Sequence, residues 1–446
     1  MRVLIIDFDR TGLDIAYRSA EAGHEVRWWM PQHVDGSPLR SGDGFPGIVK
    51  VKAWQDSMKW AGKDGLILNL FNDRKITAEL DKWRLFGYPV FGPTPKSAAL
   101  EIQRGLGMQY FEKFGFEVPA YHTFPTLDAA LAFAWKAQDP FVLKPMGDEA
   151  DKSLTYVAHD PADLVSFLEL KKEQGFKVKG QLMLQEKVDL LMEVGISGWV
   201  GSAGFLAPKN LNIEHKKLMN DDYGPSTGEQ GTVCKYFTDT DDSQLVDALM
   251  KFEEPLVQMG HTGDFDIGGA ITKKGKFVPF EVSARMGWPS TYILFQCHEG
   301  DPVQWCRDAI DGRDTLEVDE RCAVGVVMAK PPYPAMNEEP GKSVGCVVTG
   351  IEDVWEHVSP VELMIEKGPT MHNGKVVMEP VYKTTGDYIC CMTAKGPDLH
   401  DAIPQVYAAV SSIKYQDRMA RTDIGKDLEH KLPKAKALGF HELMDW

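Results

Sequence analysis

The stretch Lys276–Pro289 reads KFVPFEVSARMGWP and predicts a β-strand that carries reactive side chains. Successive strand side chains alternate between two faces, so Glu281, Ser283 and Arg285 are predicted to point the same way. Oxygen ligands suit a hard cation such as Mg²⁺, and a guanidinium suits a phosphate or a carboxylate. Phosphoryl transfer needs this combination. The plainer interpretation is an amphipathic strand with a solvated polar face.

Length and composition predict a globular protein with a small-molecule function. The 446 residues suffice for roughly two to four domains, and 43% of them are apolar, which is ample for buried cores. The formal net charge is -16 and the basic residues are scattered, so a nucleic-acid or anionic-membrane surface is disfavoured. We therefore expect neither nucleic acid nor membrane among its partners.

The cysteines and the N-terminus indicate the compartment. Among the seven cysteines only Cys390 and Cys391 are close in sequence, and no CxxC pair suggests structural zinc, so reduced thiols are expected. The opening MRVLIIDFDR predicts a strand rather than a signal peptide, and no apolar run approaches membrane-spanning length. These features predict a cytoplasmic protein.

Residues 1–100 alternate strand and helix signals. Arg2–Ile6 is a buried strand pattern, Gly12–Ala22 has helical spacing, and Glu25–Trp29 is the next strand, which together predict a βαβ unit. Such units bind ligands at the carboxyl ends of their strands. The turn Asp7–Gly12 lacks the glycine spacing of a dinucleotide fingerprint, which argues against the alternative of a nicotinamide-dependent oxidoreductase.

The middle of the chain contains a second candidate site. Helical patterns cover Pro95–Phe114 and Leu127–Ala137, and Pro140–Pro145 then predicts a buried strand that ends near Lys144. The loop Met146–Ser153 follows. A lysine beside a polar loop can serve a nucleotide phosphate as a point charge, although it can equally extend to solvent.

The last part of the chain is predicted to be rich in β-structure. Strand patterns cover Cys322–Ala329, Val344–Gly350 and Asp387–Ala394, and Leu399–Ile413 predicts a helix. This region begins after about residue 325.

The run EHKKLMNDDYGPSTGEQG, Glu214–Gly231, resembles the signature of the phosphoribosylamine-glycine ligases, which are ATP-grasp enzymes of purine synthesis. Other segments follow in that family's order: FGPTPKSAALE (Phe91–Glu101), LQEKV (Leu184–Val188), FEVSARMG from Phe280, and RTDIG (Arg421–Gly425). Each motif is short, but their common order extends the likeness over nearly the whole chain.

The resemblance implies a mixed α/β fold with three domains. An N-terminal βαβ domain, which precedes the ATP-grasp region, is expected at residues 1–100. The ATP-grasp domain is expected at 101–322, with a mobile lid at about 122–190, and a small β-rich C-terminal domain at 323–446.

The resemblance also implies an ATP site. The residues that match the family's ATP contacts are Arg104, Lys144, Lys152, Ser153, Gln185, Glu186, Val188 and Glu193. Arg104 stands where the family usually has a lysine. The alternative to an ATP contact at the strand end of Gln185 and Glu186 is that its carboxylates bind a metal ion or are simply solvated.

Metal, catalytic and substrate positions follow in the same way. Glu281 and Ser283 match the magnesium pair, with Ser283 in place of an asparagine, and Arg285 and Lys144 match the catalytic cations. The positions that match the substrate-binding region are His215, Lys217, Asp222, Gly224, Pro225, Ser226 and Thr227. A histidine beside two lysines is alternatively a solvated loop residue.

The implied reaction joins glycine to 5-phosphoribosylamine through an acyl phosphate and produces ADP and phosphate. ATP and Mg²⁺ are the expected cofactors, with Mn²⁺ as an alternative, and the protein is expected to be a monomer or homodimer. Two alternatives are a ligase that uses a different amine and a nucleotide-binding relative without catalytic activity.

Three departures from the family concern the acceptor. Asp7–Arg10 replaces a glycine-rich turn, Trp288 replaces an aspartate, and Thr385–Asp387 replaces a Gly-Gly-Arg sequence. Acidic side chains at the first turn would oppose the phosphate of phosphoribosylamine. We therefore expect that amine to be a poor acceptor or to bind in a changed pose.

Overall fold

A computed structural model describes residues 1–31, 33–34, 37–146, 155–178, 180–238, 243–334, 343–443 and 446. The chain forms two compact units. Unit 1 comprises Met1–Ala98, Gly195–Asp266 and Ala284–Trp446, and unit 2 comprises Ala99–Val194 and Ile267–Ser283. The three-domain division expected from the sequence stays a prediction.

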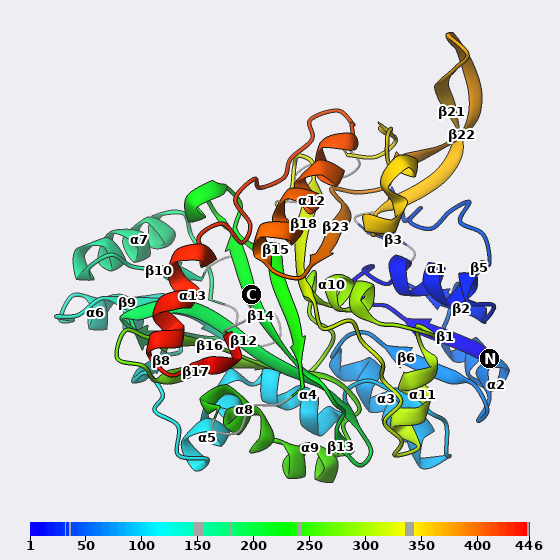
Figure 1. The fold of residues 1–446 in the computed structure, drawn as a ribbon. Helices are drawn as coiled ribbons and strands as arrows, with labels where there is room; N and C mark the ends of the chain where they lie inside the picture. The colour runs from blue at the N-terminus through cyan, green and yellow to red at the C-terminus, as the bar shows by residue number, and fades with distance from the viewer. Residues whose placement is uncertain are drawn as a thin grey trace. The chain divides into compact units, whose positions relative to one another are not determined.

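Unit 1 begins with a parallel five-stranded sheet of order β5-β2-β1-β6-β7, drawn in blue in Figure 1. Its strands are β1 (Arg2–Ile6), β2 (Glu25–Trp29), β5 (Ile48–Val51), β6 (Leu66–Asn69) and β7 (Val90–Phe91), and its helices are α1 (Leu13–Glu21), α2 (Gln55–Ala61) and α3 (Arg74–Leu85). Strand order reverses at β1, because β2 and β6 pair with its opposite edges. Ligands of open α/β sheets bind at such a switch point, beyond the carboxyl ends of the strands.

Antiparallel strands in the order β12-β14-β15-β18-β23-β20 form part of a second sheet; β12 begins in unit 2 and ends in unit 1, and the other five strands lie in unit 1. Their bounds are β12 (Leu190–Gly201), β14 (Lys209–Lys217), β15 (Ser226–Phe237), β18 (Cys322–Ala329), β23 (Tyr388–Gly396) and β20 (Val358–Pro360). Every residue of β18 is buried, as its continuous apolar sequence predicts. Helices α10 (Ser290–Cys297) and α12 (Leu399–Ser412) pack against this sheet.

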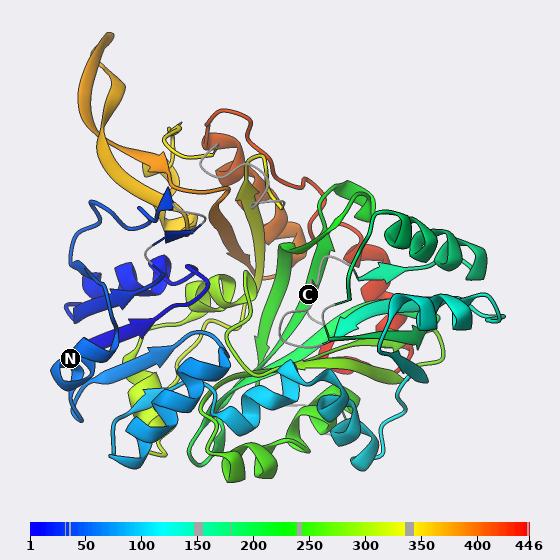
Figure 2. The same ribbon diagram turned by 180° about the vertical axis from the view of Figure 1, so that it is seen from behind.

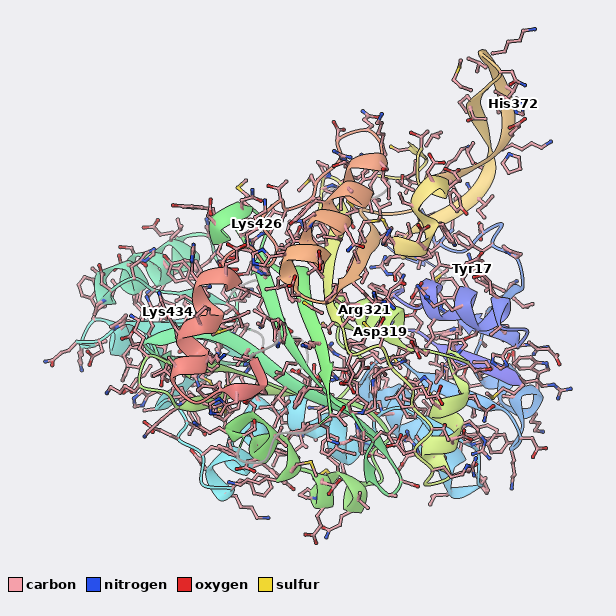
Figure 3. The ribbon with its side chains drawn as sticks, viewed as in Figure 1. Tyr17, Asp319, Arg321, His372, Lys426 and Lys434 are labelled. Carbon is pink, nitrogen blue, oxygen red and sulfur yellow. The ribbon has the colours of Figure 1, made fainter. Side chains whose placement is uncertain are left out.

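A long hairpin extends from unit 1 and is drawn in orange in Figures 1 and 2. It consists of β21 (Leu363–His372) and β22 (Lys375–Thr384), and β19 (Val347–Val348) pairs with its base. His372 is labelled near the tip in Figure 3. The turn is Asn373-Gly374, whose φ angles of 49° and 74° suit a two-residue hairpin loop.

The remaining elements of unit 1 are short. They are β3 (His33–Val34), β4 (Ser37–Pro38), β13 (Gly204–Phe205), η2 (Asn220–Asp222), α8 (Gln244–Met250), α9 (Glu253–Met259), α11 (Gln304–Ile310), η3 (Glu352–His357), α13 (Leu428–Ala437) and η4 (His441–Leu443). Strand β16 (Gly263–Thr272) begins in unit 1 and ends in unit 2.

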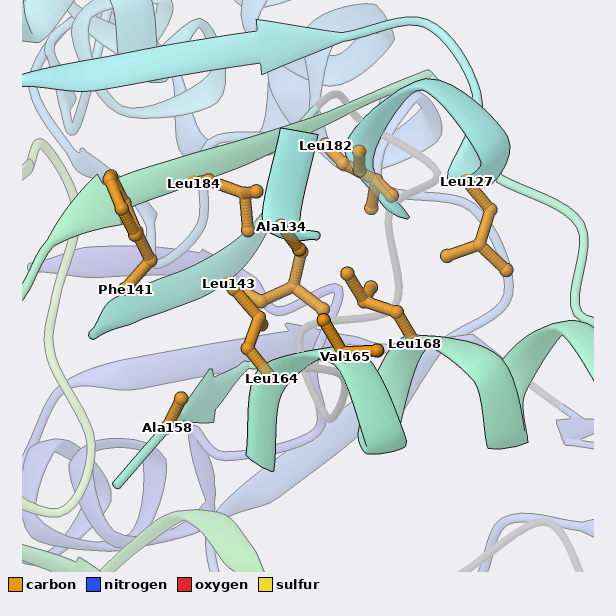
Figure 4. Packing of buried hydrophobic residues seen from close by; sticks show 11 residues of the cluster. Leu127, Ala134, Phe141, Leu143, Ala158, Leu164, Val165, Leu168, Leu182 and Leu184 are labelled. Carbon is orange, nitrogen blue, oxygen red and sulfur yellow. The ribbon is translucent and has the colours of Figure 1, made fainter. Parts of the chain in front are cut away.

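Unit 2 contains an antiparallel sheet of order β10-β9-β11-β8. Its elements are α4 (Pro95–Ile102), which starts in unit 1, α5 (Arg104–Lys113), β8 (Tyr121–Phe124), α6 (Leu127–Ala134), β9 (Phe141–Met146), β10 (Tyr156–Val157), α7 (Pro161–Glu173), β11 (Gln181–Glu186) and β17 (Phe277–Ser283). Figure 4 shows Leu143, Leu164 and Leu182 directed toward one another in the core between the sheet and its helices. Asp160 caps α7 by accepting a hydrogen bond from the Asp163 amide, 2.9 Å away.

The structure confirms the mixed α/β fold and the opening βαβ unit. It corrects two element predictions. The helix predicted over Pro95–Phe114 is two helices that meet at Gln103, and the strand predicted over Val344–Gly350 contains only β19 as a named strand. Across the described part of the chain, no helix has the length and apolar character needed to cross a membrane.

Candidate active site

Strand β17 presents the predicted metal pair on one face. Glu281 and Ser283 are half-buried, and Val282 between them is buried, as strand alternation requires. The strand ends at Ser283, so alternation does not determine the direction of Arg285. The prediction that Arg285 shares the face of Glu281 and Ser283 therefore stays a prediction.

Arg104 lies against Glu281. Its Nη1 is 2.9 Å from Oε2 of Glu281, and the Arg104 side chain is 19% exposed. Arg104 is the first residue of α5, which packs on β17. Gly107 permits the close packing of α4 and α5, because a Cβ there would lie 2.8 Å from the carbonyl oxygen of Leu100. The helix start therefore places a cation beside the predicted metal-binding carboxylate.

Lys144 lies within β9 rather than at its end. Its ammonium group is 5.2 Å from the ring centroid of Phe280, the residue before Glu281 in β17. A cation over an aromatic face at this distance is attracted to the ring. The side chain is half-buried, so the contact does not support simple extension into solvent. Lys152 and Ser153 lie outside the described residues.

Two of the predicted ATP contacts, Gln185 and Glu186, end β11. Gln185 is 2% exposed, and its Nε2 has no hydrogen-bond partner among the described residues. The Glu186 amide donates to the carbonyl oxygen of Ala120 at 2.8 Å, and the Glu186 side chain is exposed. Val188 is half-buried, and Glu193 is exposed on β12. An amide nitrogen buried without a partner costs about 1 to 3 kcal/mol, which a bound ligand would offset.

His215 is not a solvated loop residue. It lies in β14, is 5% exposed, and its Nε2 accepts a hydrogen bond from the Gly425 amide at 3.2 Å. Burial lowers its pKa, so the imidazole is neutral at pH 7. Its observed role is to join β14 to the segment Arg421–Gly425.

The expected substrate loop is the turn of the β14–β15 hairpin. Gly224 has a φ of 81°, and the Pro225 carbonyl oxygen accepts from the Leu218 amide at 3.1 Å. Ser226 begins β15, and Thr227 Oγ1 donates to the Lys216 carbonyl oxygen at 2.9 Å. The turn is thus a folded structure rather than an open loop.

Arg421 holds this turn and was not among the predicted site residues. Its Nη1 donates to Asp222 Oδ1 at 2.7 Å and to the carbonyl oxygen of Lys217 at 3.1 Å, and its Nη2 donates to Asp423 Oδ2 at 2.6 Å. The Arg421 side chain is 1% exposed. The motif RTDIG was the available sequence signal, but nothing in the sequence showed which partners the arginine would take.

Arg285 lies near the carboxyl end of β6 within unit 1. Its Nη1 donates to the carbonyl oxygen of Met286 at 2.9 Å, and its guanidinium is 5.8 Å from the ring centroid of Phe71. Phe71 follows β6 by two residues and stacks with Phe8 at a centroid distance of 6.1 Å. The predicted catalytic arginine is therefore close to the switch point of the parallel sheet.

Asp7 is directed at the backbone of its own turn. Its Oδ1 accepts from the Thr11 amide at 3.1 Å, and its Oδ2 accepts from the Gly12 amide at 2.7 Å and from Trp28 Nε1 at 3.0 Å. The side chain is fully buried, and burial raises its pKa to about 6. Arg10 has a φ of 67°, and its Nη1 is 3.8 Å from Glu362 Oε1.

The comparisons identify related proteins. Residues 323–427 match the model of a protein family described as Phosphoribosylglycinamide synthetase, C domain. The phosphoribosylamine-glycine ligase of Clostridium acetobutylicum is 23% identical over 428 residues, covering 90% of this chain and 97% of that protein. The enzyme of the same name from Allochromatium vinosum is 28% identical over 442 residues, covering 95% and 98%.

Solved structures show the same fold. Phosphoribosylamine-glycine ligase from Thermotoga maritima matches with a TM-score of 0.68 at 18% identity and covers 95% of this chain and 100% of that one. N5-carboxyaminoimidazole ribonucleotide synthetase from Thermotoga maritima matches with a TM-score of 0.55 at 16% identity and covers 93% and 99%. In sequence and in fold, the chain is therefore similar to the phosphoribosylamine-glycine ligases.

Proposed function

We propose that the protein is an ATP-dependent carboxylate-amine ligase, similar in reaction to phosphoribosylamine-glycine ligase. The observation that supports this most directly is the arrangement around β17 in unit 2. Arg104 contacts Glu281, Lys144 lies over Phe280, and Ser283 shares the face of Glu281. Two cations beside two oxygen ligands suit a nucleoside triphosphate and its metal ion.

The nucleotide would bind to unit 2. Lys144 and Arg104 offset the charge of the phosphates, and the buried amide of Gln185 gives the adenine ring a hydrogen-bond donor. Val188 lies against the base. The exposed Glu193 accepts hydrogen bonds from the ribose hydroxyls. The backbone of Glu186 lies along the base in this proposal, and the predicted ATP contacts Lys152 and Ser153 are outside the described residues.

Glu281 and Ser283 are the residues that would hold Mg²⁺, or Mn²⁺ in its place. Their donor set fits, since a carboxylate and a hydroxyl on one strand face are oxygen ligands of the kind hard cations prefer. When bound, the cation neutralises charge on the ATP phosphates. Ser283 is a neutral ligand, so Glu281 provides the only negative charge of the pair.

The chemistry proceeds by two displacements. A substrate carboxylate oxygen attacks the γ-phosphorus of ATP, the bond to the β-phosphate oxygen breaks, and ADP leaves an acyl phosphate behind. An amine nitrogen then attacks the acyl carbon, loses a proton to solvent, and expels inorganic phosphate as the amide forms. In unit 2, Lys144 holds the transferred phosphoryl group by charge, and no covalent nucleophile of the protein is required. The catalytic role of Arg285, which belongs to unit 1, stays a prediction from the resemblance.

The amino-acid substrate is assigned to the β14–β15 hairpin. Arg421 fixes Asp222, while His215 fixes the base of the hairpin through Gly425. Lys217 and the turn residues from Gly224 to Thr227 would contact the substrate. Small molecules are therefore the proposed partners, and the monomeric or homodimeric state and the cytoplasmic location remain predictions.

The test is amino-acid-dependent ADP release. Purified protein with ATP and Mg²⁺ is incubated with each of the common amino acids, and hydroxylamine is added to trap the acyl phosphate as a hydroxamate. We expect one or a few amino acids to give both ADP and hydroxamate. Nucleotide binding by calorimetry without ADP release from any amino acid would instead support the nucleotide-binding relative without catalytic activity.

A further inference from the structure

The turn after β1 has backbone amides that could bind an anion, but they already donate hydrogen bonds to a side chain of the protein itself. The amides of Thr11 and Gly12 come directly before α1, at the end where a helix favours negative charge. Both donate to the carboxylate of Asp7, and Trp28 adds a third donor. A Cβ at Gly12 would lie 3.0 Å from Asp7 Oδ2, so the carboxylate rests directly on the turn. A phosphate therefore finds these donors already occupied.

A second turn in unit 1 also lies against a carboxylate of the protein itself. Glu362 is 5% exposed, and its Oε2 accepts from the Tyr388 amide at 2.8 Å. Burial raises the pKa of Glu362, and the neighbouring backbone amides of Tyr388 and Asp387 oppose that rise. A Cβ at Gly386 would overlap Glu362, so this carboxylate lies directly on the turn formed by Thr385, Gly386 and Asp387.

The two filled turns belong to one cluster. Arg10, next to the first turn, has its Nη1 3.8 Å from Glu362 Oε1. Tyr292 donates its hydroxyl to the Thr11 carbonyl oxygen at 2.8 Å, and its ring centroid is 6.4 Å from that of Tyr388. The Trp288 ring lies 4.4 Å from that of Tyr292. All of these residues are in unit 1, at the switch point where ligands of parallel sheets bind.

Two buried polar side chains of this cluster point to a ligand. Asp387 is 3% exposed, and its Oδ2 has no hydrogen-bond partner among the described residues. Asn69 ends β6 opposite Ile6 of β1, is 3% exposed, and its Nδ2 likewise has no hydrogen-bond partner in the described part of the chain. Buried polar groups are normally hydrogen-bonded, so a ligand donor would complete the bonding of Asp387 Oδ2 and a ligand acceptor that of Asn69 Nδ2.

On the basis of the proposed ligase function, we propose that the acceptor is an amine without a phosphate group, neutral or cationic at its far end, whose remaining polar groups donate hydrogen bonds to Asp387. Charge supports this class. The cluster contains the three carboxyl groups of Asp7, Glu362 and Asp387. The nearby cations of unit 1 are Arg10, which already faces Glu362, and Arg285, which lies over Phe71. A dianionic phosphate would add repulsion at close range, whereas a hydroxyl or ammonium group would satisfy the buried carboxylate oxygen.

The experiment compares matched amines that differ only by a phosphate. Ethanolamine is paired with phosphoethanolamine, and glucosamine with glucosamine 6-phosphate, each with ATP, Mg²⁺ and the amino acid that gives hydroxamate. Amide formation and competition against hydroxylamine trapping are both measured, so that an amine that binds without reacting is also detected. We expect the unphosphorylated member of at least one pair to be preferred tenfold or more.

The outcomes separate the two proposals. The assignment of the acceptor is overturned if the phosphorylated amines are used equally well or preferred, or if no amine has any effect at millimolar concentration. In either case hydroxamate formation would still support the ligase function. Absence of hydroxamate with every amino acid overturns the ligase function. In that case the same pairs are compared by calorimetry, where tighter binding of the phosphorylated members or no binding overturns the acceptor assignment.

A charge change at Asp387 tests the residue itself. Asp387→Arg should reduce the preference for unphosphorylated amines at least tenfold, and Asp387→Asn should reduce it less. The readout is the ratio of activity with the unphosphorylated amine to activity with its phosphorylated partner, measured within each variant. A general loss of activity therefore cancels. Asp247→Arg is the matched control, because Asp247 is an exposed carboxylate of α8 in the same unit. An unchanged ratio in folded Asp387→Arg would remove Asp387 from the acceptor site.

Discussion

Glu281 is the residue on which the proposed chemistry depends most. It is the only carboxylate of the metal pair, and its Oε2 already contacts Arg104 at 2.9 Å. A neutral replacement would leave the Arg104 guanidinium without its ion pair and the metal ion without a charged ligand. Both changes act on bound ligands rather than on the core, because the Glu281 side chain is 38% exposed.

Glu281→Gln is therefore expected to lower kcat by about a hundredfold or more while the protein remains folded. ADP release at several Mg²⁺ concentrations and thermal unfolding are the measurements. Glu117→Gln is the control, since Glu117 is an exposed glutamate of unit 2 that pairs with Lys276. Full turnover of Glu281→Gln at limiting Mg²⁺ would exclude Glu281 as the metal ligand.

Lys144→Ala tests the phosphate contact. Loss of a charge-assisted hydrogen bond worth about 1.5 to 3 kcal/mol should weaken ATP binding by about ten- to a hundredfold. Calorimetry with ATP measures the change directly. Lys273→Ala removes an exposed lysine of the same unit and should leave binding unaltered. Unchanged ATP affinity in Lys144→Ala would show that the lysine only packs on Phe280.

Among the structural elements, β18 is held at its start by a cluster of charges. Asp319 accepts from the Arg321 amide at 3.0 Å and from Arg321 Nη2 at 2.7 Å, and it pairs with Lys395 of β23 at 3.0 Å. Figure 3 labels Asp319 and Arg321 close together. The hydrogen bonds from Arg321 hold the pKa of Asp319 well below its usual range. The ionised carboxylate therefore stabilises the junction of β18 and β23.

Asp319→Asn should lower the free energy of unfolding at pH 7 by about 1 kcal/mol, since Arg321 is largely exposed and its pairing is screened. A depressed pKa contributes stability above the unfolded value of about 3.9, and that contribution is lost as the pH falls below it. Urea unfolding at pH 7 and at pH 3 should thus show a smaller difference at pH 3. Asp247→Asn is the control, and a difference that grows at low pH would contradict the prediction.

At this scale the sequence predicted strands better than turns. β1, β2 and the alternation of Glu281 and Ser283 followed from apolar periodicity alone. The end of β17 at Ser283 did not, because no glycine or proline marks it. The target of Asp7 and the presence of Glu362 at the second turn could not be predicted, since both depend on contacts that folding creates between distant segments.

On the scale of the whole molecule, unit 2 has a core of its own. Leu164 of α7 is fully buried in the cluster shown in Figure 4. Leu164→Ala should lower the stability of unit 2 by about 2 to 5 kcal/mol, as expected for a buried leucine. Hydrogen exchange should show lost protection in β9 and β11 and little change in β1. Leu170→Ala is the matched control, since Leu170 of the same helix is 48% exposed. Equal loss of protection in both units would show that they unfold as one.

The order in which the two units occur along the chain has a consequence for synthesis. Unit 2 is complete at Ser283, whereas unit 1 requires residues up to Trp446. At about 5 to 20 residues per second, a ribosome needs on the order of ten to thirty seconds to make the segment from Ala284 to Trp446. The nascent chain therefore holds every segment of unit 2, the proposed nucleotide-binding unit, before Glu362 and Asp387 of the proposed acceptor site have been translated.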